Sequence, residues 1–343
     1  MYQLLAETQV NPVEWNDNVK RLNGCAFHSY EWSLFSSEKN NEMPIYFRLY
    51  DDSKIIHSMA IGFMKNIRLA GKTLFKTLSM GSFPACNDHN FLQIMIKEII
   101  KYCHRNRVIS CGMHSFGTPS GTGILDAMGF STEKRWEFLL NMPTSEEELW
   151  NRIHSKKRNL IRKAQKEKIR VEQVTEIDEV MELRKLAFET QKRKEDDGIP
   201  FPVADESHYR LLKNRLIDSG LGRLYLAYEE NEAVAGAFFV GYNKSAYYML
   251  SSAKEKGLQK AAPDLILWTS MKDYQQGGYK VFNFGGLSER ELNGEPLEKS
   301  GLFHFKKRFS SNEYLCYKGT LILKPVTFKV YEFLRKTKSR LFG

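Results

Sequence analysis

The residues best suited to chemistry lie close together, between positions 281 and 309. An apolar Val-Phe-Asn-Phe stretch runs into Gly285 and Gly286, and after a polar loop the chain reads Phe-Lys-Lys-Arg-Phe at positions 305–309. Glycine accepts positive φ and lets a ligand approach the backbone closely. A strand that ends in two glycines, followed by a cationic helical turn, is suited to binding an anion. The pattern also fits a tight turn before a solvated basic helix, so the spacing alone leaves both interpretations open.

A second cationic segment covers residues 151–170, which hold nine Lys or Arg against the single Glu167. Ser145 and Glu148 predict a capping box that starts a helix, and a lapse in the apolar period predicts a break near residues 154–155. We expect the apolar face of these helices to pack on a sheet. The residues expected to face outward are Lys156, Lys157, Arg158, Arg162, Lys163 and Lys166. They form either a solvated surface or a contact to backbone phosphates.

Length and composition limit the protein classes that fit. A chain of 343 residues is natural for two domains, and a net charge of +10 favours polyanionic partners such as RNA, nucleotides, phosphorylated precursors or an acidic membrane face. The sequence shows no long apolar span and no signal peptide, so we expect a cytoplasmic protein. Five scattered cysteines and eight histidines without ligand spacing predict reduced thiols and no metal site.

The positioning elements follow from apolar periodicity, which predicts the order α-α-β-β-β-α-β-α-β in each half. The elements of the first half are expected at residues 13–22, 30–37, 45–50, 54–65, 72–80, 91–104, 108–113, 120–128 and 135–142. Those of the second half are expected at 177–192, 207–219, 222–228, 233–242, 245–252, 263–276, 279–284, 302–307 and 314–323. The fold class is therefore α/β, with two similar mixed-sheet domains at residues 1–143 and 144–323.

The tail, residues 324–343, combines apolar residues such as Val326 and Val330 with lysines and arginines. This pattern predicts a basic amphipathic helix. Such a helix packs back on the first domain, or it makes a peripheral contact with an anionic membrane.

Four ordered stretches resemble a known family. They read Ile-His-Ser-Lys-Lys-Arg-Asn-Leu-Ile-Arg-Lys-Ala (153–164), Tyr-Met-Leu-Ser-Ser (248–252), Ala-Pro-Asp-Leu-Ile-Leu-Trp (262–268), and Phe-Asn-Phe-Gly-Gly (282–286) with Leu-Phe-His-Phe-Lys (302–306). The set resembles the Fem-type (FemAB) peptidoglycan aminoacyltransferases and their relatives with tandem GNAT-like domains. The resemblance implies two such domains packed side by side, here without the long coiled-coil arm of some members.

The resemblance also implies an activity: transfer of an aminoacyl group from aminoacyl-tRNA to a primary amine of a cell-envelope precursor, at the inner face of the membrane. No tightly bound cofactor and no metal are implied. Phe305 and Lys306 match the pair at the site that handles the aminoacyl-tRNA end, and Tyr248 matches a tyrosine of the cleft. The remaining candidates for substrate binding are Trp32, Lys156, Arg158, Arg162, Lys163, Lys260, Gly285 and Gly286.

Departures from the family pattern leave alternatives open. Ser33-Leu34-Phe35 follows Trp32 where peptidoglycan-branching members tend to carry a lysine, and Leu250 replaces a second tyrosine. An acyl-CoA-dependent enzyme acting on an amino sugar or polysaccharide is the first alternative, although the turn at residues 254–262 has one glycine and three lysines and makes a poor coenzyme A loop. A non-catalytic RNA-binding module is the second.

Overall fold

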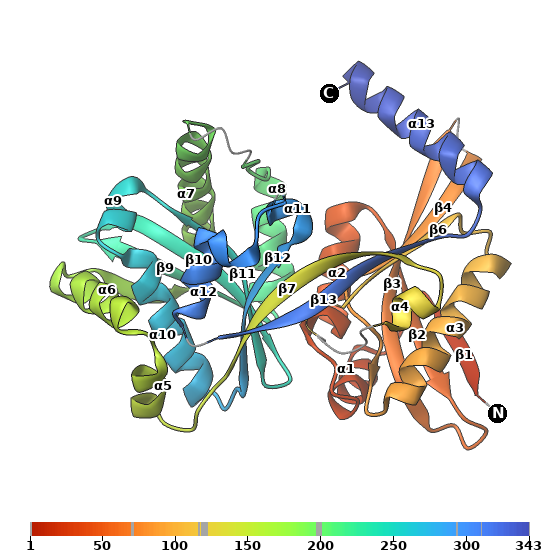
Figure 1. Cartoon of the computed structure of the whole chain (residues 1–343), viewed down its shortest axis with the longest axis horizontal. Helices are drawn as coiled ribbons and strands as arrows, with labels where there is room; N and C mark the ends of the chain where they lie inside the picture. Colours follow the sequence, from red (N-terminus) through yellow and green to blue (C-terminus); the bar gives the residue numbers. More distant parts are fainter. Residues whose placement is uncertain are drawn as a thin grey trace. The chain divides into compact units, whose positions relative to one another are not determined.

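The computed structural model describes residues 2–69, 72–115, 117, 123–196, 201–292, 294–309 and 311–342 (Figure 1). Contacts within the chain define two compact units. Unit 1 comprises residues 1–135 and 315–343, and unit 2 comprises residues 136–314. Within the described part of the chain, no helix is long and apolar enough to span a bilayer.

Unit 1 is a mixed sheet covered by helices. Its elements are β1 (Gln3–Glu7), α1 (Pro12–Arg21), α2 (Tyr30–Asn40), β2 (Met43–Tyr50), β3 (Ile56–Leu69), β4 (Lys72–Met80), β5 (Ala85–Cys86), α3 (His89–Arg105), β6 (Ser110–His114), α4 (Ile124–Ala127), most of β13 (Asn312–Ile322) and α13 (Pro325–Phe342). The strand order is β1-β2-β3-β4-β6-β13, antiparallel except for β4 with β6. The apolar stripe of α3 includes Leu92, Met95 and Ile99 and packs into the core of this unit.

Unit 2 repeats this plan. Its elements are β7 (Ser131–Asn141), which begins just before the unit, then α5 (Glu146–Arg152), α6 (Ser155–Lys166), β8 (Arg170–Val174), α7 (Ile177–Asp196), α8 (Glu206–Leu211), β9 (Gly222–Glu229), β10 (Glu232–Tyr242), β11 (Ser245–Ala253), α9 (Glu255–Gln259), α10 (Ala262–Gln276), β12 (Val281–Ser288), α11 (Glu289–Leu292) and α12 (Gly301–Lys307). The strand order is β7-β12-β11-β10-β9-β8.

The sheet of unit 2 is buried on both faces. On β10, Gly236 faces leucines of α7, whereas the Phe239 ring lies 6.2 Å from that of Tyr274 on α10. Side chains alternate between the two faces along a strand, so residues 236 and 239 of β10 point to opposite faces. Helices α7 and α10 therefore cover opposite sides of the sheet, as Figure 1 shows. Burial on both faces explains why β10 reads as an almost uninterrupted apolar run.

The expected tandem GNAT-like α/β fold is confirmed, and the predicted elements follow one another in the predicted order, although the short elements β1, β5, β8, α9 and α11 were not predicted. Each half begins with a strand that the sequence prediction missed, β1 in unit 1 and β8 in unit 2. Both are edge strands of five residues, paired on one side only, with β2 and β9. The predicted helix 207–219 is also altered, because α8 continues as a π-helical segment, Leu212–Ile217. Of the predicted helix 120–128, residues 120–122 lie outside the described residues.

Candidate active site

The site begins where two parallel strands of unit 2 separate. β11 and β12 pair at only three positions, the last joining Tyr247 to Asn283. Beyond that point β11 runs on to Ala253 and β12 to Ser288. Gly285 lies just past the last pair with a φ of +74°, which a residue with a side chain adopts only under strain. The positive φ agrees with the choice of glycine at this position, but the predicted strand end is wrong, because β12 continues through both glycines to Ser288.

Lys306 reaches this opening from α12. Its side chain is buried, and its Nζ donates a hydrogen bond to Gly286 O at 3.2 Å. A Cβ on Gly285 would lie 3.6 Å from Lys306 Nζ and 3.5 Å from Tyr248 O. The glycine pair, the Lys306 ammonium and the β11 backbone therefore lie close together.

A buried polar chain supports the glycine pair from β7. Glu137 Oε2 accepts a hydrogen bond of 2.8 Å from Asn283 Nδ2, and Asn283 Oδ1 accepts one of 2.7 Å from the backbone N of Gly285. Both side chains are fully buried. The sequence analysis missed these two residues, although a polar side chain between Phe282 and Phe284 in an apolar strand indicates a buried hydrogen bond.

Lys157 corrects the prediction that the cationic face of α6 points outward. It is buried and forms an ion pair with Asp264 in the first turn of α10, with its Nζ 3.9 Å from the Phe305 ring centroid. The apolar face of α6 packs on α10 as well as on the core. Lys157 shares the helical register of the buried Ile161 and Ala164, and this position was the signal for burial.

Burial governs the protonation of this ion pair and of Tyr248. Loss of water lowers the pKa of the Lys157 ammonium and raises the pKa of the Asp264 carboxyl. Burial also raises the pKa of Tyr248 to about 12, while its hydrogen bond with Ser251 works in the opposite direction. At neutral pH Tyr248 is therefore a phenol that donates a hydrogen bond and cannot serve as a base. Its ring stacks on Phe239, with the centroids 5.2 Å apart.

The remaining predicted binding residues do not gather at this point. Lys156, Arg162 and Lys163 are exposed on α6, and Arg158 is half-buried there. Lys260, just after α9, is paired with Glu229 and lies 3.4 Å from Glu167. Trp32 belongs to unit 1, where its ring lies 4.8 Å from that of Phe27 and 5.4 Å from that of Phe35.

A cavity of about 450 Å³ in unit 2 lies along the loop that connects β12 to α12. Trp136, Leu292 and Leu297 are the apolar residues of its lining, which also includes Glu289, Glu295 and Glu298. Several negative charges around one opening attract a cation.

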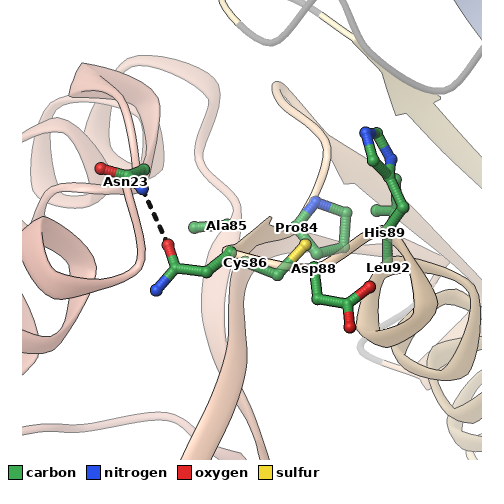
Figure 2. A pocket seen from close by; sticks show the side chains of 8 residues that line it. Asn23, Pro84, Ala85, Cys86, Asp88, His89 and Leu92 are labelled. Carbon is green, nitrogen blue, oxygen red and sulfur yellow. Dashed lines mark hydrogen bonds between the residues drawn. The ribbon is translucent and has the colours of Figure 1, made fainter.

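A smaller cavity in unit 1, about 180 Å³, lies beside the start of α3 (Figure 2). Its amide and carboxyl side chains are already used by the fold. Asn23 donates to Asn87 across it at 2.8 Å, and Asp88 caps α3 by accepting from Asn90 N at 2.8 Å. Burial raises the pKa of the Cys86 thiol, so this sulfur is a poor nucleophile.

A thiol and an imidazole meet elsewhere in unit 1. Cys25 Sγ lies 3.2 Å from His28 Nδ1, a candidate base that the sequence had not suggested. Both side chains are buried, and His28 Nε2 lies 2.6 Å from Phe83 O. The imidazole thus links two backbone segments inside the core, out of reach of a substrate. Among the described residues, no group of His, Cys, Asp or Glu side chains is arranged to hold a metal ion.

Comparison with known proteins agrees with this fold. Residues 151–307 match the family model described as an acetyltransferase (GNAT) domain, and residues 93–198 match that of the FemAB family. The solved structure of FemX superposes with a TM-score of 0.74 at 14% identity, covering 96% of this chain and 99% of FemX. The chain is an acyltransferase with a GNAT domain, and part of it is similar to the FemAB family. The GNAT match includes Lys157, Tyr248, Asp264, Gly285 and Lys306.

Two further structures share the fold of this acyltransferase. A tandem GNAT protein from the clavulanic acid biosynthesis pathway has a TM-score of 0.51 at 8% identity, covering 94% of this chain and 98% of its own. The C-terminal domain of a putative lysylphosphatidylglycerol synthetase from Agrobacterium fabrum has a TM-score of 0.56 at 12% identity, covering 93% and 95%. At these identities the likeness shows the fold alone. No curated protein sequence matches the acyltransferase.

Proposed function

We propose that this acyltransferase moves an aminoacyl group from aminoacyl-tRNA to a primary amine of a cell-envelope precursor. The observation that carries the proposal is the buried Lys306 ammonium, held 3.2 Å from Gly286 O where β11 and β12 separate. An acyl group placed in this opening has a fixed positive charge beside it. Such a charge stabilises the oxyanion that forms when an ester is attacked, and it does so most strongly in a site with little water.

The protonated amine first releases one proton to water, and the neutral amine then reacts without a protein base. The amine nitrogen attacks the ester carbonyl carbon, the new C–N bond forms, and the bond to the ribose oxygen breaks. The proton lost by the amine goes to that leaving oxygen, carried by the neighbouring ribose hydroxyl of the donor. Tyr248, neutral at pH 7, donates a hydrogen bond to a reacting group. The Lys306 ammonium stabilises the negative charge on the carbonyl oxygen.

The charges of unit 2 favour tRNA over coenzyme A as donor. In ordinary GNAT enzymes the turn before the helix equivalent to α10 offers backbone N–H groups to a pyrophosphate. Here Lys254 and Lys256 are paired with Glu232, and the first turn of α10 holds the Asp264 carboxylate. The exposed lysines of α6, in contrast, are suited to the phosphates of a nucleic-acid backbone.

The acceptor is assigned from charge. A primary amine is protonated at neutral pH because its pKa is near 10. The three glutamates around the 450 Å³ cavity attract this cation and raise its local concentration beside the loop that leads to α12. An amino sugar would be attracted in the same way, so the acceptor assay must include both classes of amine.

The deciding experiment is an activity assay with aminoacyl-tRNA and a panel of primary amines, run on the wild type and Lys306→Met. We expect kcat to fall roughly 100-fold or more with little change in KM, as when an oxyanion donor is removed. Lys307→Met is the matched control, because Lys307 is the adjacent lysine and is paired with Glu313 outside the opening. Its kcat should stay within about twofold of the wild type.

Three results would contradict the proposal. Full activity of Lys306→Met at an unchanged unfolding temperature removes that lysine from the mechanism. Release of free thiol from an acyl-CoA, with no consumption of aminoacyl-tRNA, identifies the coenzyme A-dependent alternative. Tight binding of tRNA with no transfer to any amine supports the RNA-binding module.

A further inference from the structure

Helix α13 at the end of the chain carries an apolar face that the described structure leaves in solvent. Val326 is 79% exposed, Phe333 69%, Val330 49% and Leu334 45%. From Val326 to Val330 is four residues, and from Val330 to Phe333 and Leu334 is three and four, so all four lie on one side of the helix. Single exposed apolar residues are common, but four on one helical face mark a surface that binds something.

The opposite side of α13 already has a partner in unit 1. The Tyr331 ring lies 5.7 Å from that of Phe75 on β4 and 5.9 Å from that of Phe328 one turn earlier. Both tail residues are half-buried. The helix is therefore held on its own unit by one side, and the face with Val330 and Phe333 is not needed for that attachment. In Figure 1 the C-terminal end of α13 extends away from the sheet of unit 1.

The charge of this segment identifies the partner. Residues 325–342 contain five Lys or Arg and one Glu. Lys329 is exposed within the segment, and Glu332 lies 3.1 Å from Arg335. A helix with an apolar face and an excess of cationic residues lies in the plane of a membrane surface, with its apolar side chains among the acyl chains and its cations at anionic headgroups.

We propose that the outward face of α13, formed by Val326, Val330, Phe333 and Leu334, docks this acyltransferase on an anionic lipid bilayer. Two other partners fit less well. RNA would pair with the cationic side chains of α13 but would leave its apolar side chains in water. A second copy of the chain brings two cationic helices against each other, because a two-fold interface places the same surface on both sides.

The test is co-sedimentation of the full-length protein with vesicles, one set of phosphatidylglycerol and phosphatidylcholine at a ratio of 1 to 3, the other of phosphatidylcholine alone. We expect binding to the anionic set that is at least tenfold tighter and weakens with salt. The double variant Val330→Ser/Phe333→Ser should bind about tenfold more weakly or worse. Val13→Ser is the matched control, since Val13 on α1 is 71% exposed, and it should bind like the wild type.

A charge variant tests the electrostatic part separately. Lys329→Gln should weaken binding to anionic vesicles about fivefold, whereas Lys97→Gln, at an exposed lysine of α3, should not. All these positions are exposed, so the unfolding temperature should stay constant.

Several outcomes overturn the docking surface. These are no binding to either vesicle, equal binding to both, or wild-type binding of the double variant. A dimer that dissociates in the double variant assigns the face to a second copy, and tRNA binding lost in the same variant assigns it to RNA. The vesicle assay contains neither donor nor acceptor, so its result is independent of the proposed reaction.

Discussion

Units 1 and 2 have nearly the same sequence of elements but different polar residues in their cores. Among the described residues, the buried polar side chains of unit 1 are serines and His28. In the described part of unit 2, four acidic or basic side chains are buried, those of Glu137, Lys157, Asp264 and Lys306. Burying charge costs free energy unless it is paired, so charge placed in one of two similar folds marks the unit that carries a site.

The parallel strands differ in the same sense. In unit 1, β4 and β6 remain paired up to Met80, the last residue of β4. In unit 2, β11 continues for six residues beyond its last pair with β12. The two parallel strands therefore stay paired in unit 1 and separate in unit 2, and unit 2 is the one that buries the charged side chains.

The largest expected effect tests whether the core of unit 2 depends on its ion pair. Asp264→Ala leaves the Lys157 ammonium, only 4% exposed, without its carboxylate. We expect a loss of about 3–5 kcal/mol in the free energy of unfolding of unit 2. Hydrogen exchange during denaturant unfolding measures this, because it reports the amides of each unit separately.

Two controls sharpen this result. Lys157→Met/Asp264→Leu removes both charges together and should recover most of the lost stability. Glu98→Ala in unit 1 breaks an exposed pair with Lys101 and should cost less than about 1 kcal/mol. A small effect of Asp264→Ala, equal to that of Glu98→Ala, would show that the ammonium of Lys157 has other support.

The second prediction concerns a titratable group of unit 1. Burial, with help from Lys318 and Arg135, lowers the pKa of His114 from 6.5 to about 4. The folded state then excludes a proton that the unfolded state takes up below pH 6.5, so stability falls as the pH drops from 6.5 to 4. The loss is at most about 3 kcal/mol. Unfolding of unit 1 in His114→Gln should depend less on pH across this window; identical profiles would contradict the assignment.

The sequence predicted most of the fold because long amphipathic and strongly apolar segments have a residue pattern that identifies them as helices or strands. The helices α3, α7 and α10 and the strands β4, β10 and β11 lie within a few residues of the predicted ranges. The short edge strands β1 and β8 were missed. They gain their stability from pairing with β2 and β9, a tertiary contact that local pattern does not contain.

The site was only partly predictable. Gly285 and Lys306 were found because glycine and lysine have distinctive local chemistry. The partnership of Lys157 with Asp264 joins residues 107 positions apart, and that of Glu137 with Asn283 joins residues 146 apart. A single sequence does not show which residues so far apart along the chain come into contact. Lys157 was expected to face outward although its register on α6 fits burial, and only the fold identifies its partner.

The third prediction tests the point in unit 2 where β11 and β12 separate. Gly285→Ala strains a backbone at φ +74° and places a methyl group 3.6 Å from Lys306 Nζ. We expect activity to fall about tenfold or more. Gly278→Ala is matched, because Gly278 has a φ of +77° in the same unit with no atom within 4 Å of an added Cβ. It should lose similar stability, about 1 kcal/mol, with full activity. Equal activities of the two variants would separate Gly285 from the reaction.

The smallest expected effect distinguishes two lysines proposed to bind the donor. Lys163 is exposed on α6, whereas Lys260 is already paired with Glu229 and lies near Glu167. A phosphate that binds Lys260 must displace these carboxylates, so the free energy gained from the new contact is partly cancelled. Lys163→Gln should therefore weaken tRNA binding about two- to fourfold and lower the slope of log affinity against log salt by about one. Lys260→Gln should change affinity less than about twofold. The reverse order would place the tRNA backbone beside α9 and would make the exposed lysines of α6 a solvated surface.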